Sequence, residues 1–166
     1  MTGTRIETEN LVLVPHTPED VRAQIERMTA DQKAQLSPEW LAMFRAAESP
    51  DPWVLGFALV HRVTEVAVGT CGFKGPPGAD GVVEIAYGVA SDHQGKGYAT
   101  EAAEALVAYA FGTGQVCVVR AHTLPESNAS ARVLTKCRFQ RIGEVIDPED
   151  GLVWRWERYD RTEASA

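Results

Sequence analysis

The sequence between residues 94 and 100 reads Gln94-Gly95-Lys96-Gly97-Tyr98-Ala99-Thr100, and it joins a predicted strand to the strongest predicted helix of the chain. The first N–H groups of a helix have no partner inside it, and the helix dipole adds partial positive charge at that end. Glycines let the backbone approach an anionic group closely, and Lys96 adds a positive charge. The segment therefore predicts an anion-binding turn.

The helix that follows this turn is predicted from its apolar spacing. Apolar side chains recur at intervals of three and four residues, which is typical of a helix with one buried face. They are Ala99, Ala102, Ala103, Leu106, Val107 and Ala110. Gly112 and Gly114 end the pattern, so we expect the helix to stop there.

Outside this helix, the sequence alternates between strand and helix patterns. Seven segments have the β-branched or alternating apolar residues that are typical of strands: 11–14, 53–61, 66–73, 82–89, 115–124, 142–146 and 152–159. Two helices are predicted after Thr17 and Ser37, each of which precedes a proline. A short third helix is predicted after Ser127 or Asn128.

Three phosphate-binding motifs compete for the glycine-rich turn. The Walker motif fails because Ala90 stands where its first glycine belongs and Gly97 where it needs serine or threonine. The dinucleotide motif is weak because Thr100 replaces its third glycine and no βαβ unit precedes it. Gln94, Gly97 and Ala99 match a third pattern, Gln/Arg-x-x-Gly-x-Gly/Ala. It resembles the pyrophosphate signature of the GNAT superfamily of N-acetyltransferases, and a helix start that merely needs glycines is the alternative.

The order of elements also resembles the GNAT fold, from about residue 11 to residue 159. That resemblance implies an α/β (α+β) fold with a mixed, mostly antiparallel central sheet of about seven strands. Helices are expected on both faces, and the fourth and fifth strands are expected to splay apart. Segments 84–89, 98–102 and 128–130 resemble the Rim-type branch, which includes acetylases of ribosomal-protein amino termini. Residues 1–166 are expected to form one N-acetyltransferase domain.

The resemblance implies acetyl-CoA as the cosubstrate, bound in the gap between the splayed strands. Its pantetheine is expected along the backbone of Tyr87, Gly88 and Val89. The pyrophosphate is expected at the turn and helix start, formed by Gln94, Gly95, Lys96, Gly97, Tyr98, Ala99 and Thr100. Asn128 resembles the family asparagine that contacts the cofactor, a role that is compatible with helix capping.

Acetyl transfer to nitrogen needs a base that deprotonates the ammonium and a group that protonates or tolerates the departing thiolate. Glu84 is the predicted base, because family carboxylates act from this strand, often through a water; a surface glutamate is the alternative. The tyrosine that many members use as the acid is absent, since Leu134 stands at its position. Ser130 matches a serine of the Rim-type branch and is the substitute, with helix capping as its alternative.

These residues predict an enzyme that moves the acetyl group of acetyl-CoA to a primary amine by direct attack in a ternary complex. The acceptor is expected to be a small-molecule amine or a protein N-terminal amine. Acids in the loop 147–151 are compatible with a cationic acceptor, although a solvated acidic loop is the simpler interpretation. Segment 28–40 is the other candidate for acceptor contacts. The alternative is an acyl-CoA-binding sensor of the same fold with little or no transfer activity.

Composition limits the other partners. Sixteen basic and 23 acidic side chains give a net charge of −7, which argues against nucleic-acid binding. No apolar run approaches the ~20 residues of a membrane helix. The three cysteines lack CxxC spacing, so we expect buried free thiols and no metal site. The N-terminus has no basic-then-apolar leader, which predicts a cytoplasmic protein. We expect a monomer or a homodimer.

Two further positions, Arg138 and His122, each allow two interpretations. The family usually has glycine where Arg138 stands, so we expect left-handed backbone there at a cost of roughly 1 kcal/mol, or a different helix end. His122 follows Arg120 near the end of a predicted strand and could line the cleft. Ordinary packing or surface placement is the simpler interpretation of this histidine.

Overall fold

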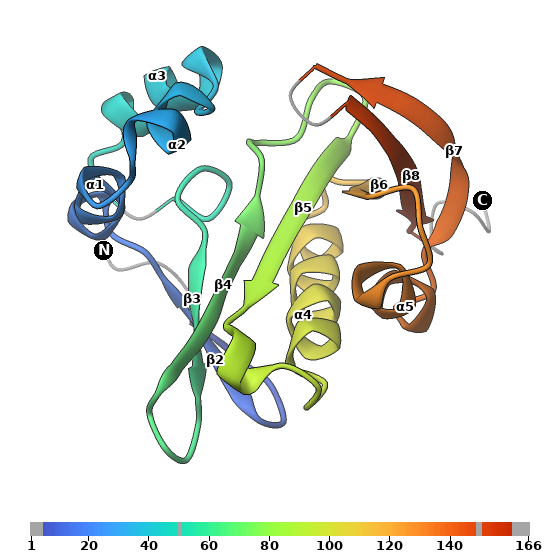
Figure 1. Ribbon diagram of the computed structural model, residues 1–166, viewed down its shortest axis with the longest axis horizontal. Helices are drawn as coiled ribbons and strands as arrows, with labels where there is room; N and C mark the ends of the chain where they lie inside the picture. Colours follow the sequence, from blue (N-terminus) through green and yellow to red (C-terminus); the bar gives the residue numbers. More distant parts are fainter. Residues whose placement is uncertain (1–4, 50, 149–150, 161–166) are drawn as a thin grey trace.

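The computed structural model describes residues 5–49, 51–148 and 151–160. Its centre is an eight-stranded sheet in the order β1-β2-β3-β4-β5-β6-β8-β7 (Figure 1). The strands are β1 (Ile6–Glu7), β2 (Leu11–Pro15), β3 (Phe57–His61), β4 (Ala67–Phe73), β5 (Val82–Val89), β6 (Val118–Thr123), β7 (Gln140–Asp147) and β8 (Gly151–Tyr159). Within these ranges β5 and β6 pair in parallel, and the other neighbouring strands are antiparallel. The predicted mixed, mostly antiparallel sheet is confirmed, with the short β1 as an additional strand.

The helices begin where polar side chains can cap them. They are α1 (Pro18–Glu26), α2 (Ala30–Ala34), α3 (Pro38–Ala46), α4 (Tyr98–Gly112) and α5 (Ala129–Lys136), with a 3-10 turn η1 (Ser91–His93). Thr17, Thr29, Ser37 and Asn128 accept first-turn N–H groups of α1, α2, α3 and α5. The predicted caps Thr17 and Ser37 are confirmed, and α5 is capped by Asn128 rather than Ser127. The helix α2 was not predicted.

The core forms where α4 lies against the sheet, behind β4 and β5 in Figure 1. The apolar face predicted for α4 is buried from Ala102 to Ala110. Tyr109 of this helix contacts the rings of Trp53, Phe57 and Phe73. The helices α1, α2 and α3 group at one end of the sheet, at the upper left of Figure 1. This arrangement leaves the far end of β5 next to the start of α4.

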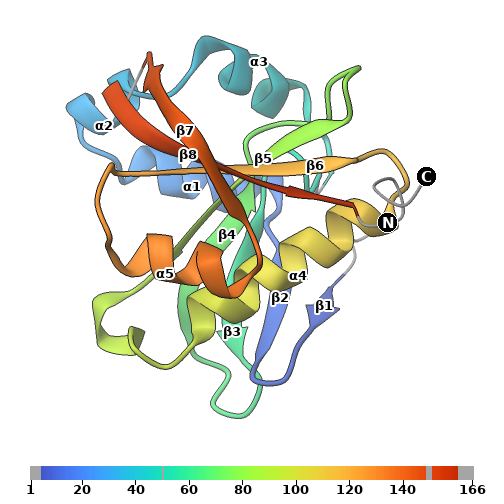
Figure 2. The same ribbon diagram turned by 90° about the vertical axis from the view of Figure 1, so that its right-hand side faces the viewer.

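The strands β5 and β6 separate soon after they meet. They pair only at Val82, Val83 and Glu84 in the described structure, whereas β5 continues to pair with β4 as far as Val89. The strand β6 turns instead to β8, with which it pairs along its whole length. Figure 2 shows α5 beside the start of α4, where Cys137 Sγ of the α5 C-cap donates to Thr100 O. The predicted splay between the fourth and fifth predicted strands is confirmed here.

The segment 53–55 corrects one strand prediction. It forms a turn before β3, in which Leu55 N donates to Asp51 O at 2.7 Å, and Gly56 follows with a φ of 74°. Val54 and Leu55 are buried against Val21 of α1. The apolar run therefore reflects burial under α1 and not strand pairing.

Two of the three cysteines and the end of α5 agree with expectation in the described residues, whereas Cys117 is less buried than predicted. All three cysteines are free; Cys71 and Cys137 are buried, and Cys117 is half-buried. Arg138 has a φ of 66°, so arginine does occupy left-handed backbone where glycine is usual. No helix in the described part of the chain combines the length and apolar character that crossing a membrane requires.

Candidate active site

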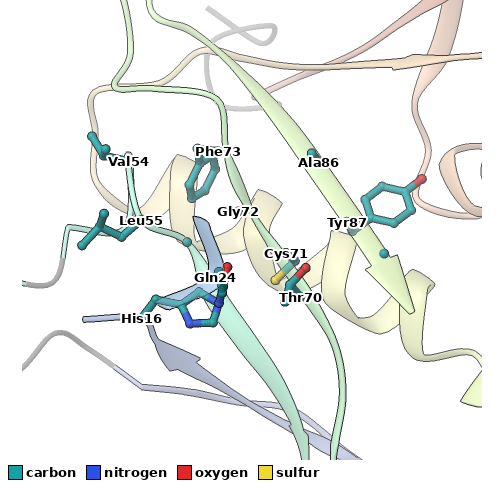
Figure 3. Close-up of a pocket in the computed structure, with 12 residues that line it drawn as sticks. His16, Gln24, Val54, Leu55, Thr70, Cys71, Gly72, Phe73, Ala86 and Tyr87 are labelled. Carbon is teal, nitrogen blue, oxygen red and sulfur yellow. The ribbon is translucent and has the colours of Figure 1, made fainter. Parts of the chain in front are cut away.

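Two adjoining cavities flank β5. The first, here called the splay cavity, opens between β5, β6 and the start of α5 and has a volume of about 440 Å³. The second, here called the β4 cavity, has a volume of about 380 Å³ and lies over β4 and β5, with His16 and Gln24 on its other side (Figure 3). Ala86 and Tyr87 line both cavities. The middle of β5 is therefore a wall that the two cavities share.

The splay cavity brings together predicted residues that are distant in sequence: Glu84, Tyr87, Asn128 and Ser130. Tyr87 and Gly88 also line the β4 cavity. Val89, the last residue of β5, and the turn 94–100, which follows β5 after the 3-10 turn η1, line neither cavity. Both predicted catalytic residues thus face one space, and the predicted anion-binding turn lies where β5 has left β6.

Two side chains contact the same carboxylate oxygen of Glu84. Lys74 Nζ lies 3.1 Å from Oε2, and His122 Nδ1 lies 2.9 Å from the same atom. The Glu84 side chain is 23% exposed and lines the splay cavity. Two directed contacts to one oxygen give this carboxylate a defined orientation.

The other ring nitrogen of His122 also has a partner. Arg155 Nε donates to His122 Nε2 at 3.0 Å. Because a guanidinium can only donate, Nε2 must accept, and the ring proton then lies on Nδ1 and points at Glu84. The His122 side chain is only 9% exposed. Arg155, His122 and Glu84 thus form a hydrogen-bonded chain in a fixed direction.

Two hydroxyl groups meet on the opposite wall of the splay cavity. Ser130 Oγ donates to Tyr87 Oη at 3.3 Å, and in Figure 3 the Tyr87 ring points away from the β4 cavity toward α5. Burial raises the pKa of Tyr87, while the hydrogen bond with Ser130 acts in the opposite direction. The phenol therefore keeps its proton at neutral pH and can serve as a donor.

The start of α4 differs from the start of every other α-helix in the described chain. Gly97 is its N-cap, with a φ of 85°, and no side chain accepts from the first turn. Gly95 also has positive φ, and a Cβ added at either glycine would meet nothing within 4 Å. Gln94 Nε2 donates to Val89 O at 2.9 Å and ties the turn to the end of β5. The open turn and the uncapped helix start suit an anion such as a phosphate.

The short helix α5 supplies a cap but no tyrosine. Asn128 Oδ1 accepts from Ala131 N at 2.9 Å, so the side chain caps the helix while it lines the splay cavity. Leu134, at the position of the family tyrosine, is fully buried. Ser130, the residue predicted as a substitute for that tyrosine, lines the splay cavity.

The β4 cavity has a polar but uncharged lining. None of the described residues that line it is aspartate, glutamate, lysine or arginine. Burial lowers the pKa of His16, against the opposing effects of Asp20 and a backbone hydrogen bond with Phe57. Burial raises the pKa of the Cys71 thiol to about 12. Both groups are therefore uncharged at neutral pH.

The sequence pattern missed the partners of Glu84. His122 does line the splay cavity, one of its two predicted placements, whereas packing or surface placement was the simpler interpretation; neither Lys74 nor Arg155 was singled out. His122 meets Arg155 because the two lie opposite each other in the β6–β8 register. Alternation along β8 predicted a half-buried strand, but no local signal reveals the residue opposite.

Other candidates for acceptor contacts and metal binding find little support. Asp147 ends β7, whereas residues 149 and 150 lie outside the described residues. No residue of segment 28–40 lines either cavity. In the described ranges no group of three histidine, cysteine, aspartate or glutamate side chains is arranged to hold a metal ion.

A comparison with protein families matches residues 10–140 to the acetyltransferase (GNAT) domain. The chain belongs to the GNAT family of acetyltransferases. The matched part of this GNAT domain runs from just before β2 to the first residue of β7 and includes every predicted site residue.

Individual relatives place the GNAT domain among acetyltransferases. It is 33% identical over 93 residues to the uncharacterised N-acetyltransferase p20 of Bacillus licheniformis, a match that covers 56% of this chain and about half, 52%, of that protein. The ribosomal-protein-S5-alanine acetyltransferase of Vibrio fischeri has a similar structure, with a TM-score of 0.67, 15% identity and coverage of 95% and 97% of the two chains. An aminoglycoside acetyltransferase in complex with coenzyme A has a TM-score of 0.63, 19% identity and coverage of 93% and 97%. These two structures share the fold.

Proposed function

We propose that this GNAT domain is an acetyl-CoA-dependent N-acetyltransferase of the Rim-type branch. The observation that carries the proposal is the splay cavity, in which a carboxylate and a pair of hydroxyls line one space next to the place where β5 leaves β6. Beyond Glu84, the edge of β5 that faces β6 has no strand partner among the residues that the structure describes. Its backbone N–H and C=O groups can therefore bond an extended molecule such as pantetheine.

Acetyl-CoA fits the residues after β5 by their chemistry. In this proposal Tyr87, Gly88 and Val89 offer backbone groups to the pantetheine, and the turn 94–100 binds the pyrophosphate. The open turn supports this, since Lys96 is exposed beside two glycines that leave room for a phosphate. The complex of a similar fold with coenzyme A supports the same ligand class. Asn128 contacts the cofactor from the splay cavity while its Oδ1 caps α5.

The proposed chemistry begins with Glu84. It takes one proton from the acceptor ammonium, directly or through a water, because only the free amine attacks. The nitrogen lone pair bonds to the thioester carbonyl carbon, the C–S bond breaks, and its electrons leave on the CoA thiolate. The nitrogen loses its second proton to solvent and the thiolate gains one, so the products are an amide, free CoA and one released proton. A backbone N–H near Val89 stabilises the oxyanion.

The proposed proton donor for the thiolate is Ser130. Its Oγ lies 3.3 Å from the Tyr87 hydroxyl, so the phenol can restore the serine proton. Burial, which raises the pKa of Tyr87, keeps that phenol protonated before each turnover. This pair replaces the tyrosine that is absent at Leu134.

The β4 cavity is the proposed site of the acceptor body. It shares the lining residues Ala86 and Tyr87 with the splay cavity, and an amine at this shared wall would be near the thioester. The uncharged lining favours an acceptor with one ammonium group and a compact neutral body over a polycation. A small-molecule amine or the first residue of a protein N-terminus meets this description. The prediction of a cytoplasmic monomer or homodimer with a single domain, residues 1–166, stays a prediction.

Release of free CoA thiol with a panel of amines tests the proposed function. The panel contains small amines with neutral bodies, short peptides with free N-termini and a polycationic aminoglycoside. We expect thiol release with a neutral-bodied amine and the acetylated product in the mass spectrum. We expect Glu84→Gln to lower kcat at least about 100-fold. Glu104→Gln, which alters a carboxylate outside both cavities, is the matched control.

Two outcomes contradict the proposal in different ways. Tight binding of acetyl-CoA without thiol release on any amine would favour the acyl-CoA sensor. If acetyl transfer is fastest to the aminoglycoside, the acceptor is not a neutral-bodied amine, but the protein is still an acetyltransferase.

A further inference from the structure

A chain of hydrogen-bonded side chains crosses three neighbouring strands behind the proposed base. Arg155 on β8 donates to His122 on β6 at 3.0 Å, and His122 Nδ1 lies 2.9 Å from Glu84 Oε2 on β5. The three residues lie on consecutive strands of the sheet, because β8 pairs with β6 and β6 pairs with β5. A histidine that only fills space in the core does not need a hydrogen-bond partner at each of its two ring nitrogens.

The other charged groups near Glu84 have separate partners or contact the same oxygen. Arg120 lies opposite Glu84 in the β5–β6 register, but its guanidinium pairs with Glu157 at 2.7 Å. Lys74 reaches Glu84 Oε2 from the end of β4 and is half exposed. Both described contacts to the carboxylate therefore fall on Oε2, and His122 is the more buried of the two partners.

We propose that His122, aligned by Arg155, is a positioning residue that orients Glu84 for proton transfer. The proposal rests on the proposed function, in which Glu84 is the base. The Nδ1–H of His122 holds Oε2, so Oε1 is the oxygen that receives the proton of the acceptor ammonium or of the intervening water. Arg155 keeps the imidazole in this tautomer, because its N–H occupies Nε2. Lys74, on a flexible stem at the surface, cannot set the same geometry.

Two substitutions at His122 separate positioning from packing. In His122→Asn the amide nitrogen takes the place of Nδ1 and can still donate to Glu84, whereas in His122→Gln the longer side chain places its amide near Nε2. We expect His122→Gln to lower kcat at least about tenfold while the KM of acetyl-CoA and of the amine change less than about twofold. We expect His122→Asn to retain kcat within about threefold of wild type. Thermal unfolding of both variants monitors the fold.

A double variant tests whether His122 acts through Glu84. If it does, Glu84→Gln and Glu84→Gln/His122→Gln have the same kcat, because the group that His122 orients is already lost. A further tenfold loss in the double variant would overturn the proposal, as would wild-type kcat in His122→Gln. Equal losses in His122→Asn and His122→Gln would show that packing, and not the Nδ1 donor, is what matters.

The tautomer of His122 provides a readout that does not depend on the amine. Long-range ¹H–¹⁵N spectra of the imidazole are expected to show a neutral ring protonated on Nδ1 in the wild type and a mixture of tautomers in Arg155→Met. An Nε2-protonated or doubly protonated ring in the wild type would overturn the positioning role. Failure of the wild-type protein to acetylate any amine would instead refute the proposed function, while the spectra still report the geometry.

Discussion

At the scale of single residues, the backbone conformation and missing side chain of Gly97 shape the proposed cofactor site. It begins α4 with a φ of 85°, a conformation that costs residues with a Cβ about 1–2 kcal/mol. Its missing side chain leaves the outside of the turn open, and its missing cap leaves the first N–H groups of α4 available. Gly114 has a similar φ, 75°, and equally open surroundings, but it follows the other end of α4.

We expect Gly97→Val to weaken acetyl-CoA binding at least about tenfold, or about 1.4 kcal/mol. The added side chain projects into the space proposed for the pyrophosphate. Gly114→Val is the matched control, since it carries a comparable backbone cost but lies away from the turn. Isothermal titration calorimetry measures both, and equal losses in the two variants would show that backbone strain alone is responsible.

The hydroxyls of Tyr87 and Ser130 act as one unit in the proposed transfer. We expect Tyr87→Phe and Ser130→Ala each to lower kcat about tenfold or more, because either change interrupts the supply of a proton to the thiolate. The double variant is expected to be no slower than the slower single variant. Tyr159→Phe, which removes an exposed phenol at the end of β8, is the control. If the kcat losses of the two single variants multiply in the double variant, Tyr87 and Ser130 act independently and not as one unit.

At the scale of elements, Glu101 ties α4 to the turn between β1 and β2. Its carboxylate accepts from the Thr8 hydroxyl, from Asn10 N at 2.8 Å and from Asn10 Nδ2 at 3.0 Å. Burial raises the pKa of Glu101, but these hydrogen bonds outweigh it, and the pKa lies below its ordinary value. The same helix that begins at the anion-binding turn is thereby held to the sheet in its first turns.

The lowered pKa of Glu101 predicts how stability changes with pH. A depressed pKa stabilises the fold above the unfolded value of 4.5, and this contribution disappears as pH falls through the folded pKa. Glu101→Gln is therefore expected to be less stable than wild type by about 1 kcal/mol at pH 7, with a smaller difference below pH 4.5. Urea unfolding across this range measures it. Glu104→Gln, which alters a more exposed carboxylate of α4, is the control, and a pH-independent difference for Glu101→Gln would contradict the prediction.

At the scale of the molecule, β5 and β6 join two parts of the sheet through three residue pairs. A ligand that occupies the splay cavity and the start of α4 contacts both parts of the sheet. Its binding is therefore expected to stabilise the native state as a whole. At 100 times its Kd, acetyl-CoA is expected to add about 2.7 kcal/mol and to raise Tm by several degrees. Differential scanning calorimetry measures the shift. Pantetheine, which lacks the pyrophosphate, is expected to shift Tm less, and an equal shift would argue against the turn 94–100.

The local elements of this fold were predictable because their signals are local. The apolar spacing of α4, the capping residues Thr17 and Ser37, and the glycines before α4 each act within one or two turns of chain. The segment 53–55 was misinterpreted because its apolar residues are buried by α1 and not by strand pairing. The strand β1 and the helix α2 are too short to carry a core-facing pattern.

By itself, the sequence determined the glycine turn before α4, the strand that carries Glu84 and a capped start of α5 at Ser127 or Asn128, since each depends on backbone propensity and neighbouring residues. Only the tertiary structure decided which groups face Glu84. His122 is 38 residues away along the chain, and Arg155 is a further 33. Such contacts depend on strand order and register, which result from packing of the whole sheet.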